Sequence, residues 1–375
     1  MPHPYHTYRK TNSCDPVSHD SFFIYDIGYS DSKKFIVICW GNRSEQEILI
    51  SLDSGKTFNK MNISACSHKH STVYSFSGEY CSNIVLKIGS EKLKTSVNKY
   101  PSFEGKTVMS TMVKNEDNYI TQWIDFHLSI GFDHFIIYDN CEAKGDKHSY
   151  HSIESSSNLP KLLKEYIKKG LVTLIRWPFP KRRVFDKRVG ISGQATSQTH
   201  CLQIFRKCSW IALFDIDEYL CFRNKNIKNL KDLFSFLYRN NFMQKNSSTT
   251  FDKNNVAGFY FSSIQFVNAK SADDRGINFF KIPYREKKVS WQRRKFFINP
   301  SNCYNYSTHT PTRNKKHTHY LRIPNVPMPH EIRYKDHGED QVLVINHYAF
   351  LNKTRGQSHS QLDLFDLDSY IQNML

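Results

Sequence analysis

Two aspartates separated by one residue follow directly on an apolar stretch of the chain. Trp210-Ile211-Ala212-Leu213-Phe214 predicts a buried strand, and Asp215-Ile216-Asp217 comes at its carboxyl end, before Glu218. Side chains two apart on an extended strand point the same way, so both aspartates can reach one point beyond the sheet. Their hard oxygens suit Mg²⁺ or Mn²⁺, and crowded like charges repel unless a cation or a basic side chain neutralises them. We expect a divalent metal site here, the alternative being a strand that simply ends in solvent.

Basic and aromatic residues elsewhere are candidates for binding the rest of a substrate. Lys181-Arg182-Arg183 follows a predicted strand at 171–177, so Arg182 and Arg183 could bind a diphosphate or an acidic acceptor. The alternative is a solvated basic loop. Trp291 lies within a basic segment at 285–295, where it could stack on an acceptor sugar or anchor a basic strand through its apolar ring.

The elements that must position these residues change in character along the chain. Up to about residue 100, short β-rich runs alternate with Gly, Asn and Ser turns, which predicts a β-rich accessory domain over 1–105. From residue 106 strands and helices alternate, which predicts an α/β domain with a parallel sheet. The predicted strands are 108–113, 135–138, 171–177 and 210–214, and the predicted helices are 120–130, ended by Gly131, 159–169 and 194–207.

Fewer helices and strands are predicted in the remainder of the 106–375 domain. We expect a helix at 230–239, a strand that begins at Val256 and runs to 261 or 267, a strand at 342–345 and a C-terminal amphipathic helix at 362–375. Ligands in open α/β sheets collect at the carboxyl ends of the strands. The acidic pair at 215–217 therefore stands where a ligand is expected.

Composition limits the class of protein but does not identify its ligand. The formal net charge of +17 predicts attraction to phosphate, anionic lipid or nucleic acid. Nine cysteines with no CxxC pair argue against a zinc ribbon or a disulfide framework. The start has no apolar signal-peptide core, and no apolar run approaches about 18 residues. We expect a soluble chain without a transmembrane segment, in the cytoplasm.

Several of these segments together resemble glycosyltransferase family 92 and related enzymes of the GT-A fold, over about residues 107–350. The resemblance is carried by motifs that occur in the family's order: Val113-Lys114-Asn115-Glu116 with Trp123-Ile124 and His127, Ile137-Tyr138-Asp139-Asn140, the run 210–220, Lys295-Phe296-Phe297-Ile298-Asn299-Pro300 with His309, and Asn346-His347-Tyr348. It implies a GT-A catalytic domain, Rossmann-like and binding a nucleotide-diphospho-sugar. It also implies transfer of a sugar, typically galactose from its UDP donor, to a glycan hydroxyl with inversion, helped by Mn²⁺.

The resemblance assigns nucleotide-sugar contacts to Lys114, Glu116, Asp139 and Asp215. Glu116 and Asp139 follow the first two strands and resemble residues that contact base and ribose. From the residues alone, Glu116 could equally be an acid at a helix N-terminus, and Asp139 a turn former.

The resemblance also assigns the metal ligands. Asp217 resembles the main ligand, Asp215 a neighbour that reaches ribose or a metal-bound water, and His347 the late histidine that completes the coordination. His347 could instead be a core histidine beside Tyr348.

Inversion requires a general base, and the family places an acid after the strand that begins at Val256. Asp273 and Asp274 fit that position, with Glu286 as another option and a surface turn as the alternative. Trp291 and His309 are the acceptor-binding candidates. The chain departs from the family at 261–265, where a Phe-Gly-Ser-Ser-Gly-like segment is expected, and we do not expect the family's usual membrane anchor in it.

Three other classes of protein remain open. A basic nucleic-acid-binding protein would suit the charge, but no recognisable module appears and Asp215-Ile216-Asp217 would be unexplained. A metal-dependent phosphatase or phosphotransferase also uses Asp-x-Asp, though normally after the first core strand. A non-catalytic carbohydrate-binding protein would bind glycans without consuming a nucleotide sugar. We favour a glycosyltransferase that has a nucleotide-sugar donor, a glycan acceptor and no nucleic-acid partner.

Overall fold

The computed structural model describes seventeen stretches of the 375-residue chain and divides it into two compact units. The first unit comprises residues 1–115, 134–211 and 298–318, and the second comprises 116–133, 212–297 and 319–375. The described stretches are 5–6, 24–40, 47–66, 71–113, 119–140, 157–177, 183–185, 188–191, 193–222, 226–239, 256–265, 284–285, 290–307, 310–313, 319–322, 343–347 and 366–367.

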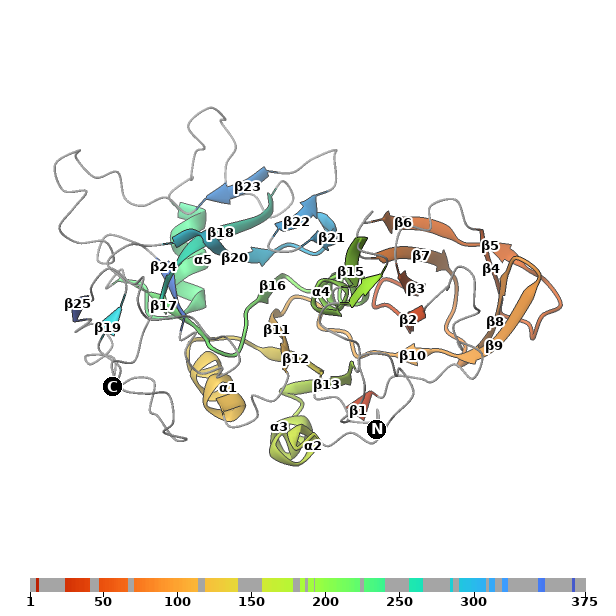
Figure 1. Ribbon diagram of the computed structural model, residues 1–375. Helices are drawn as coiled ribbons and strands as arrows, with labels where there is room; N and C mark the ends of the chain where they lie inside the picture. Colours follow the sequence, from red (N-terminus) through yellow and green to blue (C-terminus); the bar gives the residue numbers. More distant parts are fainter. Residues whose placement is uncertain are drawn as a thin grey trace. The chain divides into compact units, whose positions relative to one another are not determined.

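The first unit begins with two antiparallel-rich sheets that share one apolar core. The five-stranded sheet has the order β10-β2-β3-β7-β6, and the four-stranded sheet has the order β5-β4-β8-β9 (Figure 1). Inward-facing residues such as Phe35, Ile50, Tyr74 and Leu86 pack into a common cluster. The strands are β2 (Ile24–Tyr29), β3 (Lys34–Trp40), β4 (Ile48–Ser51), β5 (Asn59–Lys60), β6 (Asn62–Cys66), β7 (Ser71–Ser77), β8 (Asn83–Ile88), β9 (Glu91–Ser96) and β10 (Asn98–Lys99). The predicted β-rich character of this region is confirmed.

Four parallel strands follow in the same unit. The strands β1 (Tyr5–His6), β13 (Val172–Arg176), β12 (His134–Asp139) and β11 (Thr107–Val113) lie in that order, each parallel to its neighbour. Every residue of β12 is buried, as expected of a strand covered on both faces. The predicted parallel arrangement of the first three α/β strands is therefore confirmed.

Helices and hairpins complete the first unit. The helix predicted at 159–169 is two short helices, because Leu163 separates α2 (Leu159–Leu162) from α3 (Lys164–Lys168). The remaining elements are α4 (Gly193–Ile204) and the hairpins β14 (Arg183–Phe185) with β15 (Arg188–Ile191) and β21 (Cys303–Ser307) with β22 (Thr310–Arg313). The strand β16 (Trp210–Leu213) carries the chain out of this unit.

The second unit contains strands of both directions and two helices. Strands β20 (Ser290–Ile298), β18 (Val256–Gln265), β24 (Leu343–His347) and β17 (Glu218–Phe222) lie in that order, and β23 (His319–Arg322) also pairs with β18. β18 and β24 are parallel, whereas β24 and β17 are antiparallel. The helices are α1 (Ile120–Ser129) and α5 (Leu230–Arg239), and a small pair joins β19 (Tyr284–Arg285) to β25 (Asp366–Leu367).

Helix α1 has the predicted pattern and the predicted end. It buries Ile120, Trp123, Ile124 and His127, which recur at helical spacing. Gly131 then adopts φ 103°, a left-handed conformation that favours glycine, and its N–H donates to the carbonyl of Leu128.

The predicted α/β class is confirmed, with several sheets that include both parallel and antiparallel pairs. Within the predicted C-terminal helix, Asp366–Leu367 are extended, and the rest of that segment lies outside the described residues. The first compact unit runs across the expected boundary at residue 105, and the division into accessory and catalytic domains stays a prediction.

Candidate metal centre

The acidic pair lies in a tight turn between two buried strands. All four residues of β16 are buried, and β17 begins at Glu218, so the chain reverses at Ile216 and Asp217. The N–H of Glu218 donates to the carbonyl of Asp215 over 3.1 Å. We call Asp215–Glu218 the acidic turn. Its carboxylates converge because the chain turns, and not because alternate residues of one extended strand share a face.

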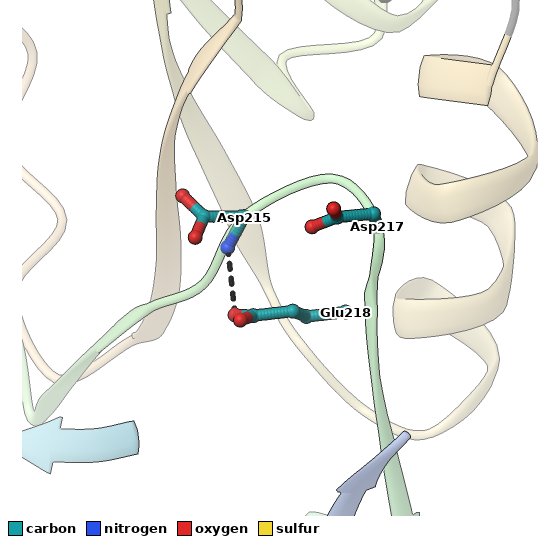
Figure 2. Close-up of side chains that lie close together, drawn as sticks. All are labelled: Asp215, Asp217 and Glu218. Atoms are coloured by element: carbon teal, nitrogen blue, oxygen red, sulfur yellow. Dashed lines mark hydrogen bonds between the residues drawn. The ribbon is translucent and has the colours of Figure 1, made fainter. Parts of the chain in front are cut away.

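Three carboxylates gather at this turn. One ligand atom from each of Asp215, Asp217 and Glu218 lies within 4.8 Å of the others. Figure 2 shows the side chains of Asp217 and Glu218 extending toward the limb of the turn that carries Asp215, and a hydrogen bond of 2.9 Å from the Asp215 N–H to Glu218 Oε2. Asp217 and Glu218 are buried, whereas the side chain of Asp215 is 26% exposed. Asp215 is therefore the carboxylate most open to an approaching ligand.

Lys295 supplies a positive charge to the acidic turn. Its ammonium lies 2.7 Å from Glu218 Oε2 and 3.1 Å from Asp215 Oδ2. The side chain comes from β20 and is only 11% exposed, so water screens these ion pairs weakly. Three carboxylates and this ammonium carry a formal charge of −2, which favours a further cation.

Helix α1 holds the strand that follows the turn. Trp123 Nε1 donates to the carbonyl of Glu218 over 2.9 Å, and the N–H of Leu220 donates to His127 Nε2 over 3.3 Å. Because Nε2 accepts, Nδ1 carries the hydrogen that it donates to the carbonyl of Trp123 at 2.8 Å. Burial lowers the pKa of His127 to about 3, which agrees with a neutral ring. These two side chains fix the backbone on either side of Tyr219.

Tyr219 lies between the α1 side chains and the acidic turn. Its ring stacks on His127, with centroids 5.7 Å apart and planes 24° apart. Burial raises the pKa of the Tyr219 hydroxyl, and the negative charge of Asp217 raises it further. The phenol therefore stays protonated beside the carboxylate.

The backbone of His347 lies opposite the acidic turn. In the antiparallel pairing of β17 and β24, Glu218 stands across from His347, and β18 places Gln265 on the other side. The side chain of His347 is outside the described residues, so its role as a ligand stays a prediction.

Asp139 closes β12 in the first unit, where three strand ends are bonded together. The carbonyl of Asp139 accepts the N–H of Trp177 at 2.8 Å, and Asn140 N–H donates to the carbonyl of Val113 at 2.8 Å. Asn140 Nδ2 donates to the carbonyl of Trp177 at 2.6 Å. These bonds align the carboxyl ends of β11, β12 and β13, the edge of a parallel sheet at which ligands bind. They give Asp139 and Asn140 a structural role, and the contact of Asp139 with the nucleotide stays a prediction.

The other predicted site residues lie on two strands or outside the described part of the chain. Arg183 lies in β14 and Trp291 in β20, and only their backbones are described. The remaining candidates lie outside the described residues: Lys114, Glu116, Arg182, Asp273, Asp274, Glu286 and His309.

Two residues of the site were not predicted from the sequence. In the sequence, Glu218 is only a third charge after the two aspartates, and Lys295 is only part of a motif in the resemblance. Lys295 directly precedes the buried Phe296 and Phe297, and a cation beside an apolar run is the available signal. Nothing in the local pattern distinguishes it from Arg293 and Arg294, because its role depends on strand pairing across 80 residues.

The residues of the acidic turn fit a divalent cation. They offer hard carboxylate oxygens from a short loop, two of the three residues are buried, and the cluster retains negative charge after Lys295 is counted. The site thus defines a mixed α/β protein with a carboxylate cluster suited to a hard metal ion.

Comparison with known proteins names the family. The sequence profile of glycosyltransferase family 92 matches residues 107–375, and the chain belongs to this family of enzymes. A family 92 protein of Ricinus communis is 24% identical over 243 residues, which cover 64% of this chain and 34% of that protein. One from Oryza sativa subsp. japonica is 28% identical over 113 residues, which cover 30% of this chain and 15% of that protein. The chain thus matches about a third or less of the length of these relatives.

Membership confirms the resemblance and the expectation of an enzyme, and a glycosyltransferase implies a sugar donor and an acceptor. None of the helices in the described part of the chain is long and apolar enough to cross a membrane.

Proposed function

We propose that this chain transfers galactose from a UDP-linked donor to a glycan hydroxyl, with inversion, in a GT-A catalytic domain whose acidic turn holds Mn²⁺ or Mg²⁺. The observation that carries the proposal is the meeting of three carboxylates within 4.8 Å at the end of a buried strand, in a member of a glycosyltransferase family. A nucleic-acid partner is not part of this function.

Asp215 and Asp217 would hold the metal, with His347 as the proposed third ligand. When bound, the cation would neutralise the negative charge of a departing diphosphate. Residues of the chain hold the site in place before a ligand binds. Trp123 and His127 fix the backbone of β17, and the buried neighbours of Asp217 exclude water and strengthen its electrostatic interactions.

The rest of the substrate is assigned to residues that carry the family resemblance. We infer that Asp139, Lys114 and Glu116 contact the nucleotide and that Arg182 and Arg183 contact the diphosphate. Their charges and positions after successive strands support this.

On the acceptor side, Trp291 and His309 are proposed to bind the sugar. Asp273 or Asp274 is proposed to take the proton from the acceptor hydroxyl.

A thermal-shift screen of nucleotide sugars with and without Mn²⁺ tests the proposal. A ligand that binds only the folded protein raises the melting temperature by mass action. We expect stabilisation by a UDP-sugar that requires Mn²⁺. Stabilisation by no nucleotide sugar under either condition would contradict the proposal, and stabilisation by phosphomonoesters alone would favour a phosphotransferase.

A further inference from the structure

Glu218 differs from the two aspartates in how its carboxylate is used. Oε2 accepts the N–H of Asp215 at 2.9 Å and also contacts the ammonium of Lys295 at 2.7 Å. Its side chain is 2% exposed, against 26% for Asp215. Oε2 of Glu218 is therefore bonded both to the Asp215 N–H and to the Lys295 ammonium, and the whole side chain is buried.

The bonds of Glu218 close the acidic turn on itself. The side chain of Glu218 receives the N–H of Asp215, and the backbone N–H of Glu218 donates to the carbonyl of Asp215. A reciprocal pair of this kind fixes both ends of a short turn, as a capping box fixes the start of a helix. The backbone of Asp215 is thereby held from both its N–H and its carbonyl.

Lys295 extends the same arrangement to the side chain of Asp215. Its ammonium bridges Glu218 Oε2 and Asp215 Oδ2, so it fixes where the carboxylate of Asp215 points. Trp123 in turn holds the carbonyl of Glu218. The backbone and side chain of Glu218 are therefore each anchored by another element of the second unit.

We propose that Glu218 and Lys295 form a positioning pair that presents Asp215 to the metal, and that Glu218 is not itself a metal ligand. This inference rests on the proposed function, because it assumes that Asp215 and Asp217 bind a divalent cation. Groups behind the ligands orient them and tune their affinity, and changing such groups alters metal affinity by about 10- to 100-fold.

A charge-matched double variant separates a positioning pair from a third ligand. Glu218→Gln removes one negative charge but keeps an acceptor for the Asp215 N–H, and Lys295→Met removes one positive charge. The double variant Glu218→Gln/Lys295→Met thus has the net charge of the wild type. Mn²⁺ affinity is measured for all four proteins by the loss of the EPR signal of the free aqueous ion, with folding checked by circular dichroism.

We expect Glu218→Gln/Lys295→Met to weaken Mn²⁺ binding by about tenfold, because it removes the pair that orients Asp215 while the local net charge is kept. Each single variant should also weaken binding, and the two losses should not add, since partners that act as one unit are lost together. Unchanged or tighter Mn²⁺ binding by Lys295→Met, beside weakened binding by Glu218→Gln, would show that Glu218 ligates the metal and would overturn the proposal. If the Met variant does not fold, Lys295→Gln replaces it in the same cycle.

Two controls separate this proposal from the proposed function. Asp217→Ala should abolish Mn²⁺ binding, and failure of the wild type to bind Mn²⁺ would remove the metal site altogether, whatever Glu218 does. Glu104→Gln removes the same charge from an exposed ion pair with Lys207 in the first unit and should leave Mn²⁺ affinity unchanged.

Amide hydrogen exchange at Asp215 gives a second readout without metal. Glu218→Gln should keep the Asp215 N–H protected, whereas Glu218→Ala removes its acceptor and should speed exchange by at least about tenfold. Equal protection in the Gln and Ala variants would contradict the hydrogen bond on which the positioning role depends.

Discussion

Two buried sites, a single aspartate in the first compact unit and a group of three acids in the second, use their carboxyl groups in different ways. In the first unit, the carboxyl group of Asp26 is bonded to an amide, a phenol and an imidazole ring. Its Oδ1 accepts Asn98 Nδ2 at 2.6 Å, and its Oδ2 accepts the hydroxyl of Tyr100 at 3.1 Å and Nε2 of His200 at 3.0 Å. His200 Nδ1 meets the hydroxyl of Tyr138 at 2.7 Å, so one carboxyl joins three segments of chain.

The acidic turn of the second unit has the opposite composition. It brings one oxygen from each of three carboxylates within 4.8 Å of the others, and the ammonium of Lys295 pairs with two of them, Asp215 and Glu218. Hydrogen-bond donors stabilise a single buried carboxyl, but like charges at this distance favour a further cation. The difference teaches that burial of an acid does not by itself identify a site. The gathering of like charges does, and four predictions follow this contrast from the largest expected effect to the smallest.

Asp217→Ala should reduce sugar transfer the most, by roughly 100- to 1,000-fold, because it removes a ligand from the proposed metal site. The melting temperature should stay the same or rise, since the change also relieves repulsion within the acidic turn. Donor turnover and a thermal melt are measured on the same preparation, with Asp217→Asn as the isosteric control. Full activity in the Ala variant would show that Asp217 holds no catalytic metal.

Asp26→Ala should lower the stability of the fold but leave Mn²⁺ binding unchanged. It leaves the donors of Asn98, Tyr100 and His200 buried without their acceptor, which costs about 2–4 kcal/mol of unfolding free energy. Urea unfolding measures this loss, and Mn²⁺ titration of the folded variant should give the wild-type affinity. A weakened Mn²⁺ site in stable Asp26→Ala protein would break the contrast between the two groups.

The sequence predicted the elements better than the contacts between them. Apolar runs and helical spacing were sufficient to place β12, α1 and α5, because their patterns are local. The division of the 159–169 helix at Leu163 and the turn at Ile216–Asp217 depend on packing that no local pattern records. The two aspartates were therefore correctly predicted to lie close together. The cause is a turn of the chain, and not the alternation of side chains along an extended strand.

Contacts between residues far apart in the sequence were not predicted at the site. Trp123 and His127 were recognised as part of a family motif, but their bonds to Glu218 and Leu220 join residues more than 90 positions apart. Lys295 meets Asp215 across 80 positions. Such pairings are decided by sheet topology, which a single sequence specifies only indirectly.

His134 extends the contrast to a buried base that has neutral partners. Its ring bonds the carbonyl of Gly170 through Nδ1 and the hydroxyl of Thr173 through Nε2, and burial lowers its pKa to about 3. The unfolded value is about 6.5. Between these two pH values, His134 is protonated in the unfolded chain but not in the folded chain. The free energy of unfolding therefore falls as the pH falls, by up to about 1.4 kcal/mol per pH unit.

The measurement is the pH dependence of urea unfolding for the wild type and His134→Gln. The variant should have a shallower slope between pH 6.5 and the range near pH 3, and equal slopes in the two proteins would show that His134 is protonated in the fold.

Asp53 supplies the smallest effect, because its carboxylate is fully satisfied and lies in solvent. Oδ1 accepts the hydroxyl of Ser51 at 2.6 Å, and Oδ2 accepts the hydroxyl of Thr57 at 2.6 Å. These bonds hold a turn in which Ser54 and Gly55 are both left-handed, with φ 63° and 93°. The hydrogen bonds place the pKa of Asp53 well below its usual range.

Asp53→Asn should lower the melting temperature at pH 7 by only about 2 °C, because water screens an exposed group. A carboxyl with a lowered pKa contributes stability above its unfolded value of about 3.9 and loses it as the pH falls toward the folded value. The difference between wild type and variant should therefore shrink below pH 4, which melting curves across that range would reveal. If Asp53→Asn changed Mn²⁺ affinity, an acid satisfied by its own turn would be coupled to the metal site, and hydrogen bonding would no longer distinguish a structural carboxylate from a functional one.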